Sequence, residues 1–84
     1  MAGDTIEEQT RQIFDNLEAI LTAAGTGLDR VVKTTVFLIS LDDFQGMNSV
    51  YVERVGDTPP ARSTVEIAGL PSGALVEIEA IALA

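Results

Sequence analysis

Arg62 and the three glutamates Glu66, Glu77 and Glu79 are the side chains of this sequence whose types and spacing could do chemistry. A guanidinium group presents a planar fork of N–H donors, which matches a carboxylate through two parallel hydrogen bonds. Arg62 could therefore bind a small carboxylate ligand. It could equally form a salt bridge with one of the glutamates across neighbouring strands. Spacing alone leaves both interpretations open.

Glu77 lies in a segment that alternates apolar and acidic residues from Val76 to Glu79. A carboxyl group beside a ligand can position a water molecule and transfer a proton. The same alternation is also typical of a solvated strand residue with no chemical role. Because Glu79 follows two residues later, on the same face of a strand, periodicity does not separate the two acids.

The composition excludes several kinds of chemistry. There is no histidine and no cysteine, so disulfides, thiol catalysis and the commonest metal ligand are excluded. There is no glycine-rich phosphate loop and no metal-ligand spacing, and clustered acids such as Asp42 and Asp43 are more typical of helix caps than of a metal site, so no metal is expected. The net charge of −8 argues against a nucleic-acid partner. No apolar run reaches membrane-spanning length and the N-terminus lacks signal-peptide features, so no membrane contact and a cytoplasmic location are expected.

Two helices and three strands must position these side chains. The first helix is the most clearly marked, because Thr5 and Glu8 form a capping box and Gly25 suits a helix end. The other elements follow from periodicity and stop signals. The full prediction is a helix over residues 5–24, a strand over 31–39, a helix from Asp42 or Asp43 to Gly56, and strands over 62–67 and 75–82.

This order predicts a single domain over residues 1–84, with a parallel strand pair joined by the second helix and both helices on one face. The last two strands, joined by a short turn around Pro71, are expected to form an antiparallel hairpin. Symmetric counting about Pro71 places Arg62 opposite Ala80, whereas polarity would place it on the Glu77 face. A thin sheet and a small core both favour an oligomer.

Two segments resemble the C-terminal signature of a known family. They are Pro60-Ala61-Arg62-Ser63, with Leu70-Pro71 after it, and Val76-Glu77-Ile78-Glu79-Ala80. At this spacing they resemble the reactive-intermediate deaminases, the RidA or YjgF-like family. Earlier stretches fit the same family, so that the resemblance extends over essentially the whole chain: Gln9-Thr10, Ala23-Ala24-Gly25, Val32-Lys33-Thr34-Thr35-Val36, Asp43-Phe44, Asn48 and Tyr51.

The resemblance implies an α/β (α+β) subunit of the chorismate-mutase-like type, with two helices on one face of a mixed sheet. Such subunits form homotrimers with pockets at the subunit interfaces. Family members hydrolyse reactive enamines and imines, such as 2-aminoacrylate, to 2-keto acids and ammonia without a cofactor. The implied partners are therefore a small imino or keto acid and further copies of the chain.

The resemblance also assigns roles to residues. It implies that Arg62 anchors the substrate carboxylate and that Glu77 positions or activates water. Asn48 matches a family asparagine near the pocket, although an asparagine on a helix is often solvated or bonded to backbone. Thr64 shares a strand face with Arg62 and is a candidate substrate contact. Tyr51 is expected in the core or at an interface.

The sequence departs from the family pattern at its start. Family members begin with strands that precede the first helix and help to line the pocket, whereas this sequence begins where that helix does, so we expect the family fold truncated at its N-terminus. A fragment, a mis-called gene start and a natural short form all fit this start. The alternative function is a non-catalytic trimeric module that binds small carboxylates. An endoribonuclease or translation inhibitor is a further alternative, against which the negative charge argues.

Overall fold

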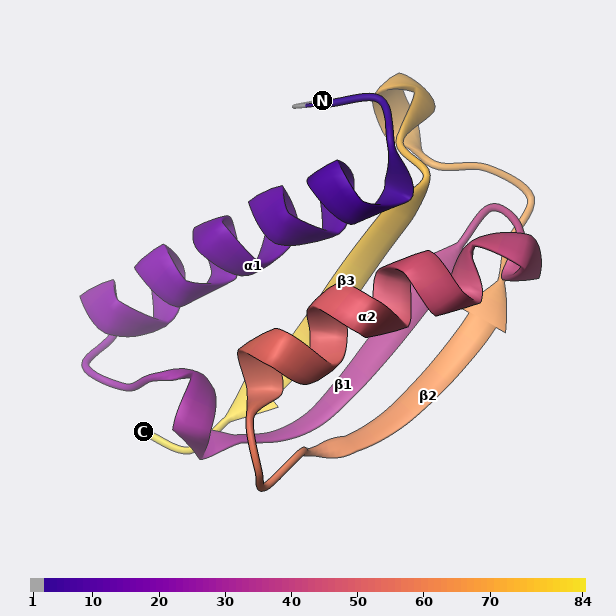
Figure 1. Ribbon diagram of the computed structural model, residues 1–84. Helices are drawn as coiled ribbons and strands as arrows, with labels where there is room; N and C mark the ends of the chain where they lie inside the picture. Colours follow the sequence, from indigo (N-terminus) through magenta and orange to yellow (C-terminus); the bar gives the residue numbers. More distant parts are fainter. Residues whose placement is uncertain (1–2) are drawn as a thin grey trace.

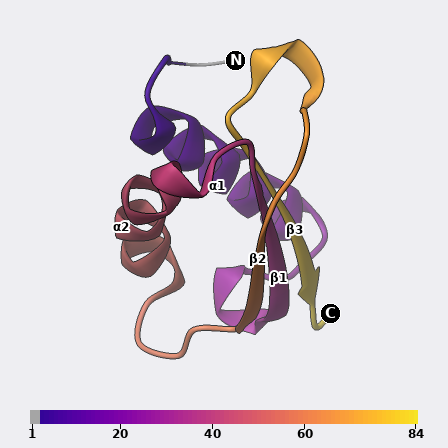
Figure 2. The same ribbon diagram turned by 90° about the vertical axis from the view of Figure 1, so that its right-hand side faces the viewer.

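The computed structural model describes residues 3–84 as two helices packed on one face of a three-stranded mixed sheet (Figure 1). The view in Figure 2 shows both helices on one side of the sheet and none on the other. This arrangement confirms the predicted fold class. The elements are α1 (Ile6–Ala23), β1 (Val31–Leu38), α2 (Phe44–Val55), β2 (Ala61–Glu66) and β3 (Val76–Ala82), with 3-10 turns at Leu28–Arg30, Leu41–Asp43 and Pro71–Gly73.

The start of α1 has the predicted capping box. The Thr5 hydroxyl accepts a hydrogen bond from the Glu8 backbone N–H at 3.1 Å, and the Glu8 carboxylate accepts one from the Thr5 N–H at 3.4 Å. These bonds satisfy donors that a helix N-terminus otherwise leaves unpaired. Beyond the other end of α1, Gly25 adopts a φ of 81°, a left-handed conformation that costs glycine little.

The start of α2 differs from the prediction. Asp43 occupies the N-cap position, but its side chain makes no capping hydrogen bond. The chain instead enters the helix through the 3-10 turn Leu41–Asp43, where the Ser40 hydroxyl accepts from the Asp42 N–H at 3.2 Å. The Glu66 carboxylate accepts from the Leu41 N–H at 2.8 Å, so the end of β2 is tied to this turn.

The predicted hairpin between the last two strands is wrong. The strand order is β2-β1-β3, with β1 parallel to β2 and antiparallel to β3. The parallel pair joined through α2 was predicted correctly. Residues 67–75 do not form a tight hairpin turn, because they carry the chain past the end of β1 to its far side (Figure 1). β1 is the most continuously apolar and β-branched strand, and in the centre it is hydrogen-bonded on both edges.

The strand register assigns each side chain to a face. Thr34 on β1 lies level with Arg62 on β2 and Ala80 on β3, whereas Phe37 lies level with Glu77 on β3. Positions 34 and 37 point to opposite faces of a strand, since side chains alternate with a period of two. Thr34 is buried under the helices. Residues level with Thr34 therefore lie on the helix-covered face of the sheet, and residues level with Phe37 lie on the opposite, bare face.

The core lies between the helix-covered face and the two helices. Its fully buried side chains include Val36 and Leu38 from β1, Val76 from β3, Phe14 from α1 and Met47 from α2. Burial of each such side chain stabilises the fold by about 1.5–3 kcal/mol relative to exposure. The bare face has no such cover, and Val65 and Ile81 on it are 40% and 64% exposed.

Candidate functional site

Arg62 is held over the side of α2 by three side chains. Its guanidinium carbon lies 4.6 Å from the ring centre of Tyr51 and 5.2 Å from that of Phe44. Its NH1 group donates a hydrogen bond to Oδ1 of Asn48 at 2.6 Å. Stacking on aromatic faces and one short hydrogen bond restrict a side chain that is otherwise among the most flexible.

The salt-bridge interpretation of Arg62 is not what the structure shows. No carboxylate within residues 3–84 pairs with this guanidinium, whereas Arg11 and Arg54 both form ion pairs. Glu66 bonds to the Leu41 backbone instead. Within this chain, the Arg62 guanidinium thus retains its positive charge without a carboxylate to neutralise it.

Asn48 and Tyr51 come from one face of α2. Asn48, predicted to be a ligand contact or a solvated side chain, contacts Arg62 directly. Tyr51, predicted for the core or an interface, is 2% exposed and packs edge-on against Phe14, with 5.6 Å between ring centres. Its hydroxyl forms a 2.6 Å hydrogen bond with the hydroxyl of buried Thr34. Sequence reasoning gave Thr34 no role, since a threonine inside a strand carries no signal of its own.

Thr64 lies on the same face of the sheet as Arg62, as predicted. Its register partners are Val36 on β1 and, across β1, Ile78 on β3. It is half-buried and makes no side-chain hydrogen bond within residues 3–84. Its predicted contact with a ligand stays a prediction.

A pocket of about 400 Å³ opens beside the Arg62 guanidinium. Its polar groups are the guanidinium, the Asn48 amide and the Tyr51 side chain, and its other walls are mostly apolar. Among residues 3–84, Arg62 is the one charged residue that lines it. The lining consists of Asn48, Tyr51, Val52, Val55, Gly56, Pro59, Pro60 and Arg62. A small anion with an apolar part matches this combination of one cation and apolar walls.

Glu77 is not part of this pocket. It lies on the bare face, on the outer strand opposite to β2, and is exposed. Glu79 shares that face, as predicted. Glu77 lines shallow cavities of about 240 and 220 Å³ together with Ile13 of α1. The expectation from polarity that Arg62 and Glu77 share a face is therefore wrong for one copy of the chain, because Arg62 is level with Thr34 on the helix-covered face and Glu77 is level with Phe37 on the bare face.

The start of β3 is fixed by a residue that sequence reasoning left without a role. Gln9 of α1 is 4% exposed, and its Oε1 accepts a hydrogen bond from the Leu75 N–H at 2.8 Å. This bond joins α1 to the backbone just before Glu77. The available signal in the sequence was a glutamine on the apolar face of the helix, since an amide that is buried there normally has a partner.

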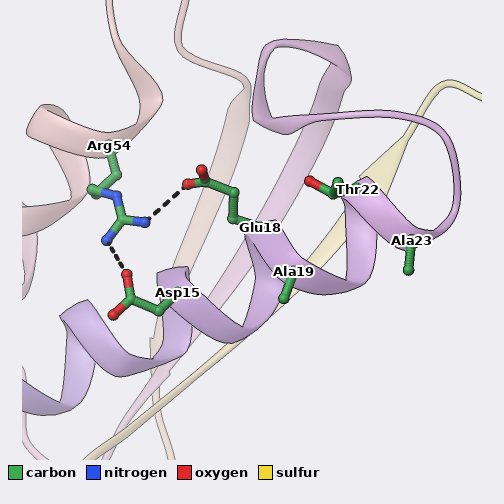
Figure 3. A pocket seen from close by; sticks show the side chains of 6 residues that line it. All are labelled: Asp15, Glu18, Ala19, Thr22, Ala23 and Arg54. Carbon is green, nitrogen blue, oxygen red and sulfur yellow. Dashed lines mark hydrogen bonds and ion pairs between the residues drawn. The ribbon is translucent and has the colours of Figure 1, made fainter.

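A cleft of about 550 Å³ lies between the two helices and holds none of the predicted site residues (Figure 3). Arg54 donates to Asp15 and Glu18 there, each at 3.0 Å, and lies 5.6 Å from the ring centre of Phe14. Burial lowers the pKa of the Arg54 guanidinium, but its hydrogen bonds to the two carboxylates raise that pKa by more. The cleft is best described as a charged clamp between α1 and α2.

No group of three or more acidic side chains within residues 3–84 is arranged to hold a metal ion. None of the helices in the same range is both long and apolar enough to cross a membrane.

Comparison with known proteins gives concordant matches. The sequence profile described as Endoribonuclease L-PSP matches residues 1–84. A RutC family protein of Pyrococcus horikoshii is 52% identical over 80 residues, which cover 95% of this chain and 63% of that protein. Crystal structures of RidA from the Antarctic bacterium Psychrobacter sp. and of the YjgF gene product from E. coli superpose with TM-scores of 0.90 and 0.89, at 43% and 45% identity.

The matches cover most of this chain but only part of each relative. The alignments include 98% of this chain and 65% of the Psychrobacter protein, and 96% of this chain and 66% of the E. coli protein. The chain thus spans about two thirds of the length of these relatives.

Proposed function

The chain belongs to the Endoribonuclease L-PSP family, which includes the RutC and YjgF proteins, and we propose that it hydrolyses small reactive 2-imino acids and their enamines to 2-keto acids and ammonia. Arg62 binds the substrate carboxylate and Glu77 of a neighbouring copy positions the attacking water. Asn48 orients Arg62, and Thr64 is a further candidate contact on the same face. No cofactor takes part.

The observation that carries this proposal is the state of Arg62. Its guanidinium is stacked and oriented, has no carboxylate partner within residues 3–84, and borders a pocket with apolar walls. An oriented arginine without a counter-ion is suited to receive a planar carboxylate through two hydrogen bonds. A 2-imino acid presents such a carboxylate beside its reactive carbon.

The chemistry needs only water and one carboxyl group. A 2-aminoacrylate-type enamine first tautomerises to the imine by gaining a proton at C3 and losing one from nitrogen. Water then forms a bond to C2, the C=N electron pair moves to nitrogen, and the Glu77 carboxylate accepts the water proton. Return of that proton to nitrogen gives a carbinolamine, with a hydroxyl and an amino group on C2. The Glu77 carboxylate then accepts the hydroxyl proton and passes it to the amino group, the C–N bond breaks, ammonia leaves and C2 becomes the keto carbon.

Both residues can act on one substrate only across an interface. Arg62 lies on the outer strand β2 on the helix-covered face, and Glu77 lies on the outer strand β3 on the bare face. The bare face also exposes the apolar Val65 and Ile81, and the sheet has two open edges. A homotrimer, in which the β2 edge of one copy meets the β3 side of the next, would bring Arg62 and Glu77 together at three equivalent pockets.

The separation of Arg62 from Glu77 also favours a second candidate. If no interface brings Glu77 to the pocket, the chain keeps the Arg62 site without a carboxyl group to activate water. It would then be a non-catalytic module that binds small carboxylates. The two candidates make the same prediction for keto-acid binding and opposite predictions for turnover.

Ribonuclease activity, although part of the family's name, has less support. The net charge is −8, and the few basic side chains are dispersed. Arg11 and Arg54 are already paired with carboxylates on the helix side. Phosphate binding depends on clustered positive charge, which residues 3–84 do not present.

The test is release of ammonia and 2-keto acid from an imino acid that an amino-acid oxidase generates in situ. We expect wild type to accelerate release, and Arg62→Ala to abolish the acceleration. Arg11→Ala is the matched control, because the Arg11 side chain is 51% exposed and lies outside the pocket. An Arg62→Ala variant as active as wild type would refute the assigned role. Wild type that binds pyruvate without acceleration would favour the binding module.

A further inference from the structure

We propose that Tyr51, oriented by Thr34, and Phe44 form a platform that sets the orientation of the Arg62 guanidinium and thereby the affinity of the site for small 2-keto and 2-imino carboxylates. This inference rests on the proposed function, since it takes Arg62 to be the carboxylate anchor. The three residues are positioning residues, and none of them contacts the reacting atoms.

The platform begins in the core. The hydroxyls of Thr34 and Tyr51 lie 2.6 Å apart, and each residue is 2% exposed. A buried hydrogen bond of this length restricts rotation of the phenol ring, which also packs edge-on against Phe14. The ring face that Tyr51 turns toward the pocket is therefore fixed by the interior of the protein and not by solvent.

Arg62 rests on that fixed ring. Its guanidinium carbon is 4.6 Å from the Tyr51 ring centre and 5.2 Å from the Phe44 ring centre. Thr34 and Arg62 are also register partners on adjacent strands, so the backbone places the arginine above the pair. Attraction between a cation and aromatic faces holds the guanidinium without using its N–H donors.

A ligand would use the Arg62 N–H donors that remain without a partner in the described chain. Asn48 accepts from NH1, the only Arg62 side-chain hydrogen bond within residues 3–84. Because the rings contribute no competing acceptor, the other N–H groups stay available for the two oxygens of a carboxylate. A salt bridge would have oriented Arg62 equally well but would have occupied this donor edge.

Orientation should affect binding more than chemistry. An arginine without its platform loses conformational freedom when it binds an anion, and that loss weakens binding. A carboxylate anchor is used in both the ground state and the transition state, so its disruption raises KM with little change in kcat. This pattern distinguishes positioning from a general loss of folded protein, which lowers the measured kcat.

The test compares ring and hydroxyl variants by titration with pyruvate and by kinetics on the imino acid. Tyr51→Phe keeps the ring, and we expect pyruvate affinity within about threefold of wild type, whereas Phe44→Leu and Tyr51→Leu each weaken it about tenfold. Thr34→Val removes the same hydroxyl bond from the other partner, so its affinity should match that of Tyr51→Phe. Arg11→Ala is the control, because the Arg11 side chain is exposed and lies outside the pocket.

Phe44 is only partly buried, so Phe44→Leu keeps the inference testable if Tyr51→Leu fails to fold. A folded Phe44→Leu variant with wild-type pyruvate affinity and KM would overturn the inference. So would an equal loss of kcat in all four variants.

The NMR signal of the Arg62 Nε–H separates this inference from the proposed function. Restricted guanidinium rotation in wild type that becomes free in Phe44→Leu would support the platform even if wild type releases no ammonia. Release of ammonia by wild type with a freely rotating guanidinium would support the deaminase and refute the platform.

Discussion

Arg62 and Glu77 lie on opposite faces of the same sheet, on the two strands that flank β1. Arg62 points to the helix-covered face, where Asn48 and Tyr51 hold it, and Glu77 is exposed on the bare face. One copy of the chain therefore contains each half of the proposed site and no complete site. The proposed activity therefore requires a second copy of the chain.

Asn48→Asp should weaken carboxylate binding more than Asn48→Ala does. The amide oxygen of Asn48 is 2.6 Å from NH1, so an aspartate there would form an ion pair with Arg62 and neutralise its charge. We expect pyruvate affinity to fall about tenfold in Asn48→Ala and well beyond that in Asn48→Asp. The midpoint temperature of thermal unfolding of Asn48→Asp should not be lower than that of wild type. Equal affinities of the two variants would contradict this role of the guanidinium charge.

Gln9→Leu should destabilise the fold and loosen the start of β3. The substitution leaves the Leu75 N–H without its acceptor, and loss of such a buried hydrogen bond costs about 1–3 kcal/mol. Urea unfolding measures the cost, and hydrogen exchange at the Leu75 amide locates it. Gln12→Leu is the matched control on the same helix, because Gln12 bonds only to the neighbouring Asn16 side chain at the surface. Unchanged protection of the Leu75 amide would contradict the assignment.

Arg54→Gln should weaken the clamp between the helices. It removes two ion pairs with exposed partners and the contact with Phe14, which together contribute about 1 kcal/mol after solvent screening. Unfolding free energies at low and high salt measure the loss, and the difference from wild type should shrink as salt rises. Arg11→Gln, which removes one exposed pair, serves as the control. Equal losses in the two variants would show that Arg54 is an ordinary surface arginine.

Local signals in the sequence predicted the helices well. The capping box of Thr5 and Glu8 and the left-handed Gly25 depend on residues only a few positions apart, and both are present as predicted. Strand partners depend on distant contacts, and the predicted hairpin failed for that reason. Residues 67–75 look like a turn in sequence, yet they carry the chain to the other side of β1.

The sequence named candidate site residues, whose roles stay predictions, and it did not reveal their geometry. Arg62 and Asn48 came from the family resemblance, and the structure places them in direct contact. The Thr34–Tyr51 bond could not be foreseen, because it depends on how α2 packs on β1. The separation of Arg62 from Glu77 follows from the strand order, which the sequence pattern alone did not reveal.

The most direct test of the central claim is complementation between two inactive variants. Arg62→Ala and Glu77→Gln are each expected to be inactive, whereas co-refolded mixtures contain interfaces that combine an intact Arg62 with an intact Glu77. For random assembly at equal amounts, about one quarter of the pockets should be intact, with ammonia release near that fraction of wild type. A co-assembled mixture no more active than its parents would contradict a site shared between copies.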